Sequence, residues 1–135
     1  RGPDARGFLS DGGTRDRRLK AHAFGLRAET FAGIYLRCKG WRVLTTRYKV
    51  PGGEIDIIAR RGDIVIFVEV KGRPTLDLAA ETITAQKQRR ISQSVRLWLS
   101  RNPWAMGKSL RGDALFIAPR AWPRHIADAF PLDLR

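Results

Sequence analysis

Apolar residues recur along this chain at two spacings, one helical and one extended. From Lys20, apolar side chains return every three or four residues as far as Leu36, and Gly40 follows at a position suited to a helix end. This pattern predicts a first helix. Three extended segments come next, separated by turn residues, and predict a meander of strands: Trp41–Tyr48, Glu54–Arg61 and Ile64–Lys71.

The second half of the chain predicts another helix and at least one more strand. Thr84 is a suitable N-cap for this helix and Asn102-Pro103 a suitable stop. Its apolar stripe consists of Ile91, Val95, Trp98 and Leu99. Residues Asp113–Ala118 predict a fourth strand, and residues 122–130 fit either a short strand or a turn of helix. Because a helix joins the third strand to the fourth, these two are expected to be parallel, which gives a mixed α/β sheet.

The dipeptide Gly62-Asp63 suits a two-residue hairpin turn between the second and third extended segments. A turn of this length places Asp56 opposite Glu69, and by the same count Glu54 faces Lys71. A four-residue loop keeps these pairs and a three-residue loop breaks them. Opposed residues share a face of the sheet, so these polar side chains are expected on one side. The other side is expected to be buried, and it carries Ile55, Ile57, Ile66, Val68 and Val70.

The opposed carboxylates of Asp56 and Glu69 repel each other, so something must offset the repulsion. Mg²⁺, or Mn²⁺ in its place, suits such a pair, because it takes one or two carboxylates and keeps several waters. Two isolated histidines and one cysteine do not build a zinc site. Lys71 is expected on the same face, about 7 Å along the strand, where its ammonium can orient or deprotonate a water or stabilise a phosphate. The alternative is a solvated face of alternating charge, with Glu54 and Lys71 as an ordinary ion pair.

Composition narrows the class of partner. The chain has 135 residues and 43% hydrophobic content, enough for one domain over residues 20–135, after a basic stretch over residues 1–19 that is expected to be disordered. The net charge of +13 favours nucleic acid as the partner, because Lys and Arg neutralise phosphates. No membrane partner is expected, because no basic helix has a broad apolar face. The single Cys38, expected in the core or at its boundary, fits a reducing compartment such as the cytoplasm.

Basic and aromatic side chains near the acid pair are candidates for substrate contacts. The residues expected to hold phosphates are Arg47, Lys49, Arg73 and Lys87. Taken singly, each fits a solvated basic surface better. Trp104 and Trp122 lie in loop-like segments and are candidates for base stacking, whereas Trp41 and Trp98 are expected in the core.

The segments Gly53–Ile58 and Phe67–Arg73, together with Gly40–Leu44, resemble the YraN-type family of uncharacterised bacterial proteins. That family is similar to archaeal Holliday-junction resolvases, of the restriction-endonuclease-like PD-(D/E)XK group. The resemblance implies a core of helix, three strands, helix and strand, and a homodimer, since related resolvases are dimers. It implies catalytic roles for Asp56, Glu69, Lys71 and Glu29, and an auxiliary role for Gln86 or Lys87. Gly112 departs from the bulky apolar residue common there and is expected to weaken the start of the fourth strand.

These features favour a metal-dependent endonuclease that acts on DNA, with branched DNA as a candidate substrate. The alternative from another class is a non-catalytic nucleic-acid-binding module that retains the nuclease fold. A third possibility is an adaptor whose basic surface meets an acidic protein. The acids and the lysine favour the enzyme, since a binding module has no need of opposed carboxylates.

Overall fold

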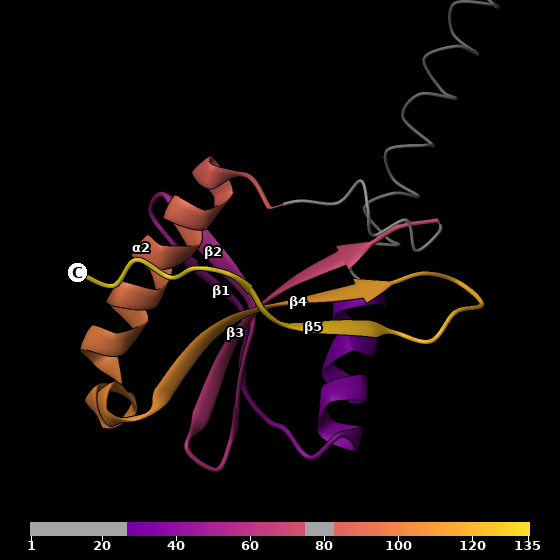
Figure 1. The fold of residues 1–135 in the computed structure, drawn as a ribbon, viewed down its shortest axis with the longest axis horizontal. Helices are drawn as coiled ribbons and strands as arrows, with labels where there is room; N and C mark the ends of the chain where they lie inside the picture. Colours follow the sequence, from indigo (N-terminus) through magenta and orange to yellow (C-terminus); the bar gives the residue numbers. More distant parts are fainter. Residues whose placement is uncertain (1–26, 75–82) are drawn as a thin grey trace, which may run out of the picture.

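The computed structural model describes residues 27–74 and 83–135, where one five-stranded sheet lies between two helices (Figure 1). The strands are β1 (Arg42–Val50), β2 (Gly53–Arg61), β3 (Ile64–Gly72), β4 (Ser109–Ile117) and β5 (Arg124–Phe130). They lie side by side in sequence order; β3 and β4 are parallel and the other neighbours antiparallel. The predicted mixed α/β class, with its restriction-endonuclease-like order of elements, is therefore confirmed. The expected tail over residues 1–19 and the start of the first helix lie outside the described residues.

The first helix ends, and the second begins and ends, where the capping residues predict. The described part of the first helix covers residues 27–38, and Gly40 follows with a φ of +92°, which glycine adopts without strain. Helix α2 (Ala85–Arg101) starts after Thr84, whose hydroxyl accepts a hydrogen bond from the Lys87 backbone N–H. It ends at Asn102, before a short 3₁₀ helix, η2 (Pro103–Gly107). None of the helices in the described ranges is long and apolar enough to cross a membrane.

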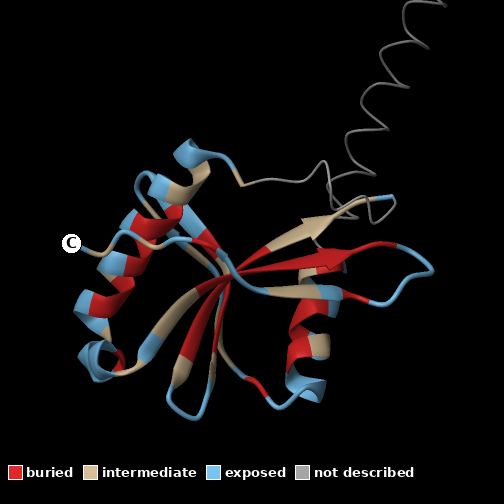
Figure 2. Ribbon diagram, viewed as in Figure 1, coloured by how far each residue is buried: buried red, intermediate tan, exposed pale blue. Residues whose placement is uncertain are grey.

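Both faces of the sheet are buried, each under one helix (Figures 1 and 2). Ile57 and Val68 pack with the first helix, and Phe67 packs with α2. The predicted stripe of α2 is buried as expected, and so are Trp41 and Trp98. The predicted face of Ile55 is wrong, because Ile55 packs under α2 and not beside Ile57. The β2–β3 ladder ends at Ile57 and Val68, so strict alternation does not extend as far as Ile55.

Strand β4 is longer than its sequence pattern predicts, since it begins at Ser109 and not at Asp113. All nine of its residues pair with β3, so tertiary pairing sets its length. Gly112 lies inside this strand and does not weaken its start. A Cβ atom at Gly112 would lie 2.6 Å from the ring of Phe130, so only glycine lets β5 pack this closely. Residues 124–130 form a strand, which settles the question left open by the sequence, and Cys38 is exposed, contrary to expectation.

Candidate active site

Asp56 and Glu69 meet where β2 and β3 separate. The hairpin register is the predicted one, and its last backbone pair is Ile57 with Val68. At the next position, the Asp56 carboxylate takes over, because its Oδ2 accepts a hydrogen bond of 2.7 Å from the Val70 backbone N–H. The carboxyl groups of Asp56 and Glu69 are also hydrogen-bonded to each other. The structure therefore brings the two acids together as the turn geometry predicts.

Burial makes this acid pair electrostatically costly. Glu69 is only 6% exposed. Burial, the charge and hydrogen bond of Glu69 and the charge of Glu29 together raise the pKa of Asp56 from 3.8 to about 8, and burial contributes most. The hydrogen bond from the Val70 N–H acts in the opposite direction. At neutral pH, Asp56 therefore keeps its proton. A cation placed between the two carboxyl groups would take the place of that proton.

Lys87 supplies the nearest positive charge. Its Nζ lies 3.2 Å from Oε2 of Glu69, and it reaches the acid pair from the first turn of α2. Burial alone would lower the pKa of Lys87, but the charges of Glu69, Asp56 and Glu54 raise it above its ordinary value, so the ammonium is retained. The sequence predicts Lys87 as a phosphate contact, whereas the structure places it against Glu69.

Two further candidates approach the pair from different elements. Glu29, on the first helix, lies close enough for its charge to raise the pKa of Asp56. Its carboxylate accepts a hydrogen bond of 3.0 Å from Nε of Arg47, a second expected phosphate contact that proves to be ion-paired. Arg47 has a φ of +51°, an uncommon conformation for a non-glycine residue. Lys71 is half-buried, two residues beyond Glu69, and forms no ion pair with residues 27–74 or 83–135.

The remaining predicted residues make other contacts or are exposed. Lys49 is exposed and pairs with Glu54 across the β1–β2 ladder. The β2–β3 ladder ends at Ile57 and Val68, so it does not include the expected pairing of Glu54 with Lys71. Arg73 is half-buried and donates a hydrogen bond to the Gly72 carbonyl. Gln86 is exposed. Trp104 and Trp122 are exposed as expected, and Trp104 packs edge-on against the buried Trp98.

A small groove of about 290 Å³ opens beside the acid pair, lined by Gly52, Gly53, Glu54, Lys87 and Arg90. Its wall depends on a close backbone contact. A Cβ atom at Gly53 would lie 2.4 Å from the Ser94 hydroxyl and 2.5 Å from the Arg90 carbonyl oxygen. Only glycine therefore lets the β1–β2 turn press directly against α2. This contact holds the helix that carries Lys87 close to the strand that carries Asp56.

The donor set at the pair fits a hard divalent cation. Two carboxylates plus water satisfy Mg²⁺, which binds few protein ligands and keeps its hydration. Within the described ranges, no group of three or more His, Cys, Asp or Glu side chains is placed to hold a metal. An all-protein cage of the zinc or calcium type is therefore not supported by these residues, whereas a water-rich magnesium site is compatible with them.

Asp113 is a structural acid whose hydrogen-bond partners are Arg111, His125 and the Asp128 backbone. It is fully buried and accepts hydrogen bonds from Nε and Nη2 of Arg111 at 2.8 and 2.9 Å, and from the Asp128 backbone N–H at 3.0 Å. Its Oδ2 lies 2.6 Å from Nε2 of His125. Burial would raise the pKa of Asp113, but the hydrogen bonds from His125 and Arg111 outweigh it and lower the pKa. The sequence gives no local signal for the His125 contact, because it depends on β4 and β5 pairing.

The comparisons with known proteins agree on one family. Residues 28–117 match the model of the family described as "Uncharacterised protein family UPF0102". A UPF0102 protein of Methylobacterium nodulans is 50% identical over 117 residues, which cover 87% of this chain and 91% of that protein. UPF0102 proteins of Methylorubrum extorquens and Methylocella silvestris are 51% and 53% identical, over 87% and 81% of this chain and 91% and 88% of theirs.

One solved structure, described as "Crystal structure of SSO0001", also aligns with the chain. The TM-score is 0.43 at 15% sequence identity, over 84% of this chain and 54% of the other. A likeness at this level carries no argument about function. The assignment of site residues therefore depends on the geometry of this chain.

Proposed function

We propose that this chain, which belongs to the uncharacterised protein family UPF0102, is a metal-dependent endonuclease that hydrolyses phosphodiester bonds in DNA. The observation that carries the proposal is the acid pair of the half-buried Asp56 and the buried Glu69, hydrogen-bonded to each other at the point where two strands part. Such a pair is costly to fold and has no structural need, since an apolar pair would close the sheet more stably. Groups whose environment raises a pKa this far occur most often at functional sites.

The acid pair would hold a Mg²⁺ or Mn²⁺ ion through the Asp56 and Glu69 carboxylates. When bound, such an ion supplies Lewis acidity and makes a bound water more acidic. Glu69 is kept in place by burial and by the Lys87 ammonium. Asp56 is kept in place by the Val70 N–H, which donates to its Oδ2. The geometry of the acids is thus set before any ligand arrives, as catalysis by electrostatic stabilisation requires.

Lys71 is the residue best suited to act on the substrate. It follows Glu69 by two positions on β3, and its ammonium has no acidic partner among the described residues. It would donate to the attacking water or to the developing charge on the phosphate. Glu29 would then tune the charge at Asp56 from the first helix, with Arg47 limiting its effect.

The net charge of +13 supports a polyanionic substrate. The motifs around the acid pair resemble those of the YraN-type family, which is similar to Holliday-junction resolvases, so a four-way DNA junction is the substrate to test first. A direct experiment incubates end-labelled duplex, single-stranded and four-way DNA with the protein, with Mg²⁺, Mn²⁺ or EDTA. Cleavage that needs the metal and is lost in Asp56→Asn is the expected result. Tight binding without cleavage of any of these DNAs would favour the non-catalytic module.

A further inference from the structure

The solvent face of α2 is a stripe of basic and amide side chains. Exposed residues recur there three and four positions apart, which places them on one side of the helix: Gln86, Arg89, Arg90, Gln93 and Arg96. The 17 residues of α2 include no aspartate or glutamate. Helices usually intersperse acids with bases, because like charges at these spacings repel. Repulsion between the arginines of the stripe therefore destabilises α2, and binding of an external anion would remove that repulsion.

This stripe is linked to the acid pair through Arg90 and Lys87, which line one groove. Arg90 lines the small groove beside Glu54 and Lys87, and it also lines a second groove of about 450 Å³ with Gln86, Arg89, Ser92, Gln93, Arg96 and Asp133. The two grooves thus share Arg90. Lys87, on the same helix, touches Glu69. A ligand that crosses the stripe toward the N-terminal end of α2 therefore arrives at the proposed cleavage site.

The arginines of the stripe keep their charges available. Arg89 and Arg90 form no ion pair with residues 27–74 or 83–135. Arg96 donates to the backbone carbonyl of Asp133, which leaves its charge uncompensated. The acids nearby are Glu54 at one end of the stripe and Asp133 at its edge.

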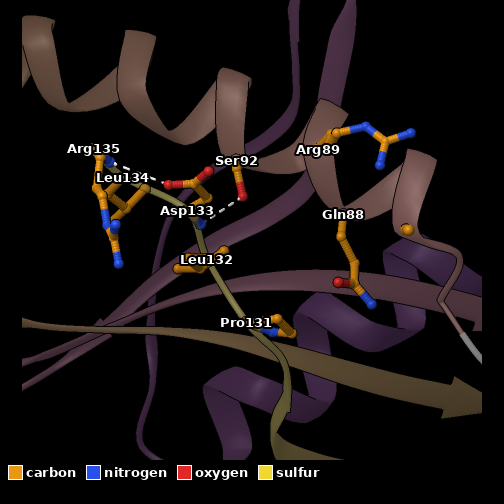
Figure 3. A pocket seen from close by; sticks show the side chains of 9 residues that line it. Gln88, Arg89, Ser92, Pro131, Leu132, Asp133, Leu134 and Arg135 are labelled. Atoms are coloured by element: carbon orange, nitrogen blue, oxygen red, sulfur yellow. Dashed lines mark hydrogen bonds between the residues drawn. The ribbon is translucent and has the colours of Figure 1, made fainter.

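The C-terminal segment borders the stripe without covering its arginines. It runs past α2 on the side of Ser92, whose hydroxyl accepts a hydrogen bond from the Asp133 N–H (Figure 3). The Asp133 carboxylate accepts a hydrogen bond from the Arg135 N–H. With these contacts made, Arg89 stays exposed beside the groove of about 830 Å³ that the segment forms with α2.

We propose that the outer face of α2 binds the phosphate backbone of duplex DNA and leads it to the acid pair. The inference rests on the proposed function only for where the DNA leads, which is the acid pair. Binding of DNA by α2 does not depend on catalysis. From Gln86 to Arg96 the helix rises by about 15 Å, and each strand of duplex DNA carries one phosphate per about 3.4 Å of the duplex axis. The stripe thus matches about four phosphates. Guanidinium groups, which bind phosphate oxygens in pairs, suit this ligand.

The test compares two triple variants with the same loss of charge. One is Arg89→Gln, Arg90→Gln, Arg96→Gln; the control is Arg37→Gln, Arg120→Gln, Arg124→Gln, which changes exposed arginines of the first helix and the β4–β5 region. Binding of a fluorescein-labelled duplex is measured by anisotropy in EDTA at several salt concentrations. The α2 variant is expected to bind at least tenfold more weakly at about 100 mM salt, with a salt slope smaller by about 2–3, and the control only slightly more weakly.

Two safeguards keep the result interpretable. The double variant Arg89→Gln, Arg90→Gln leaves the Arg96 contact with Asp133 intact, so a loss of binding there cannot be ascribed to the C-terminal segment. Equal losses in both triple variants, or none in the α2 variant, would overturn the inference. Competition with DNA by a poly-glutamate peptide of the same charge as the DNA would also overturn it, because that outcome indicates an acidic protein partner. Failure of cleavage with intact α2-dependent binding would instead remove the proposed catalytic function.

Discussion

The substitution Asp56→Asn tests the acid pair most directly. Asparagine keeps the size of the side chain and an oxygen that can accept the Val70 N–H, so the one hydrogen bond to the backbone is retained. What is lost is the ionisable group. The effect on stability should therefore come from the electrostatics of the pair and not from packing.

The size of this effect follows from the pKa of Asp56, raised from 3.8 to about 8. Because the folded protein keeps a proton that the unfolded chain releases, the free energy of unfolding falls as the pH rises through this window. Each pH unit corresponds to about 1.4 kcal/mol, which gives a ceiling of about 4 kcal/mol between pH 3.8 and pH 7. The Asn variant lacks this penalty. In EDTA it should be more stable than the wild type by a few kcal/mol at pH 7 and by almost nothing near pH 4.

The assay is urea unfolding in EDTA at pH 4, 5.5, 7 and 8, followed by thermal melting with Mg²⁺. The stability difference between the variant and the wild type should grow with pH up to about 8. Added Mg²⁺ should raise the melting temperature of the wild type more than that of the variant, since a ligand stabilises only the state that binds it. A difference that does not change with pH would refute the electrostatic reasoning. Equal stabilisation by Mg²⁺ would refute Asp56 as a ligand.

Two further substitutions test other contacts. Lys87→Met should leave the buried Glu69 carboxylate without its ammonium and lower the free energy of unfolding near pH 7 by roughly 1–3 kcal/mol; a variant as stable as the wild type in urea would show that the ion pair contributes nothing. Gly112→Ala should destabilise the fold by roughly 1–3 kcal/mol, because its Cβ would meet the Phe130 ring. Gly107→Ala is the matched control, since a Cβ there has open space, and equal losses in both would contradict this reasoning.

The sequence predicts those parts of the site that depend on local chain geometry. The Gly62-Asp63 turn sets the β2–β3 register, and counting along the strands then brings Asp56 next to Glu69. The start of α2 is likewise predicted, because the Thr84 hydroxyl caps its own helix. Turn and cap are short-range effects, so a single sequence is enough to find them.

Contacts between distant segments are not accessible in the same way. The pairing of Lys87 with Glu69 depends on how α2 docks on the sheet, and no local pattern reports that. The packing of Ile55 depends on where the ladder ends, and alternation alone cannot give that position. The extension of β4 to Ser109 likewise comes from its neighbour strand, since its first residues have little strand-like pattern of their own.

The contact of Gly53 with α2 has a practical consequence for experiments. It involves a glycine backbone, a hydroxyl and a carbonyl oxygen, none of which carries a charge. Added salt screens exposed charges, with a screening length of about 10 Å at 0.1 M, and has little effect on buried contacts between uncharged groups. High salt should therefore release a polyanion from the arginines while the acid pair and its helix stay in register. Metal binding by the folded protein can then be titrated at high ionic strength, free of any nucleic acid carried through purification.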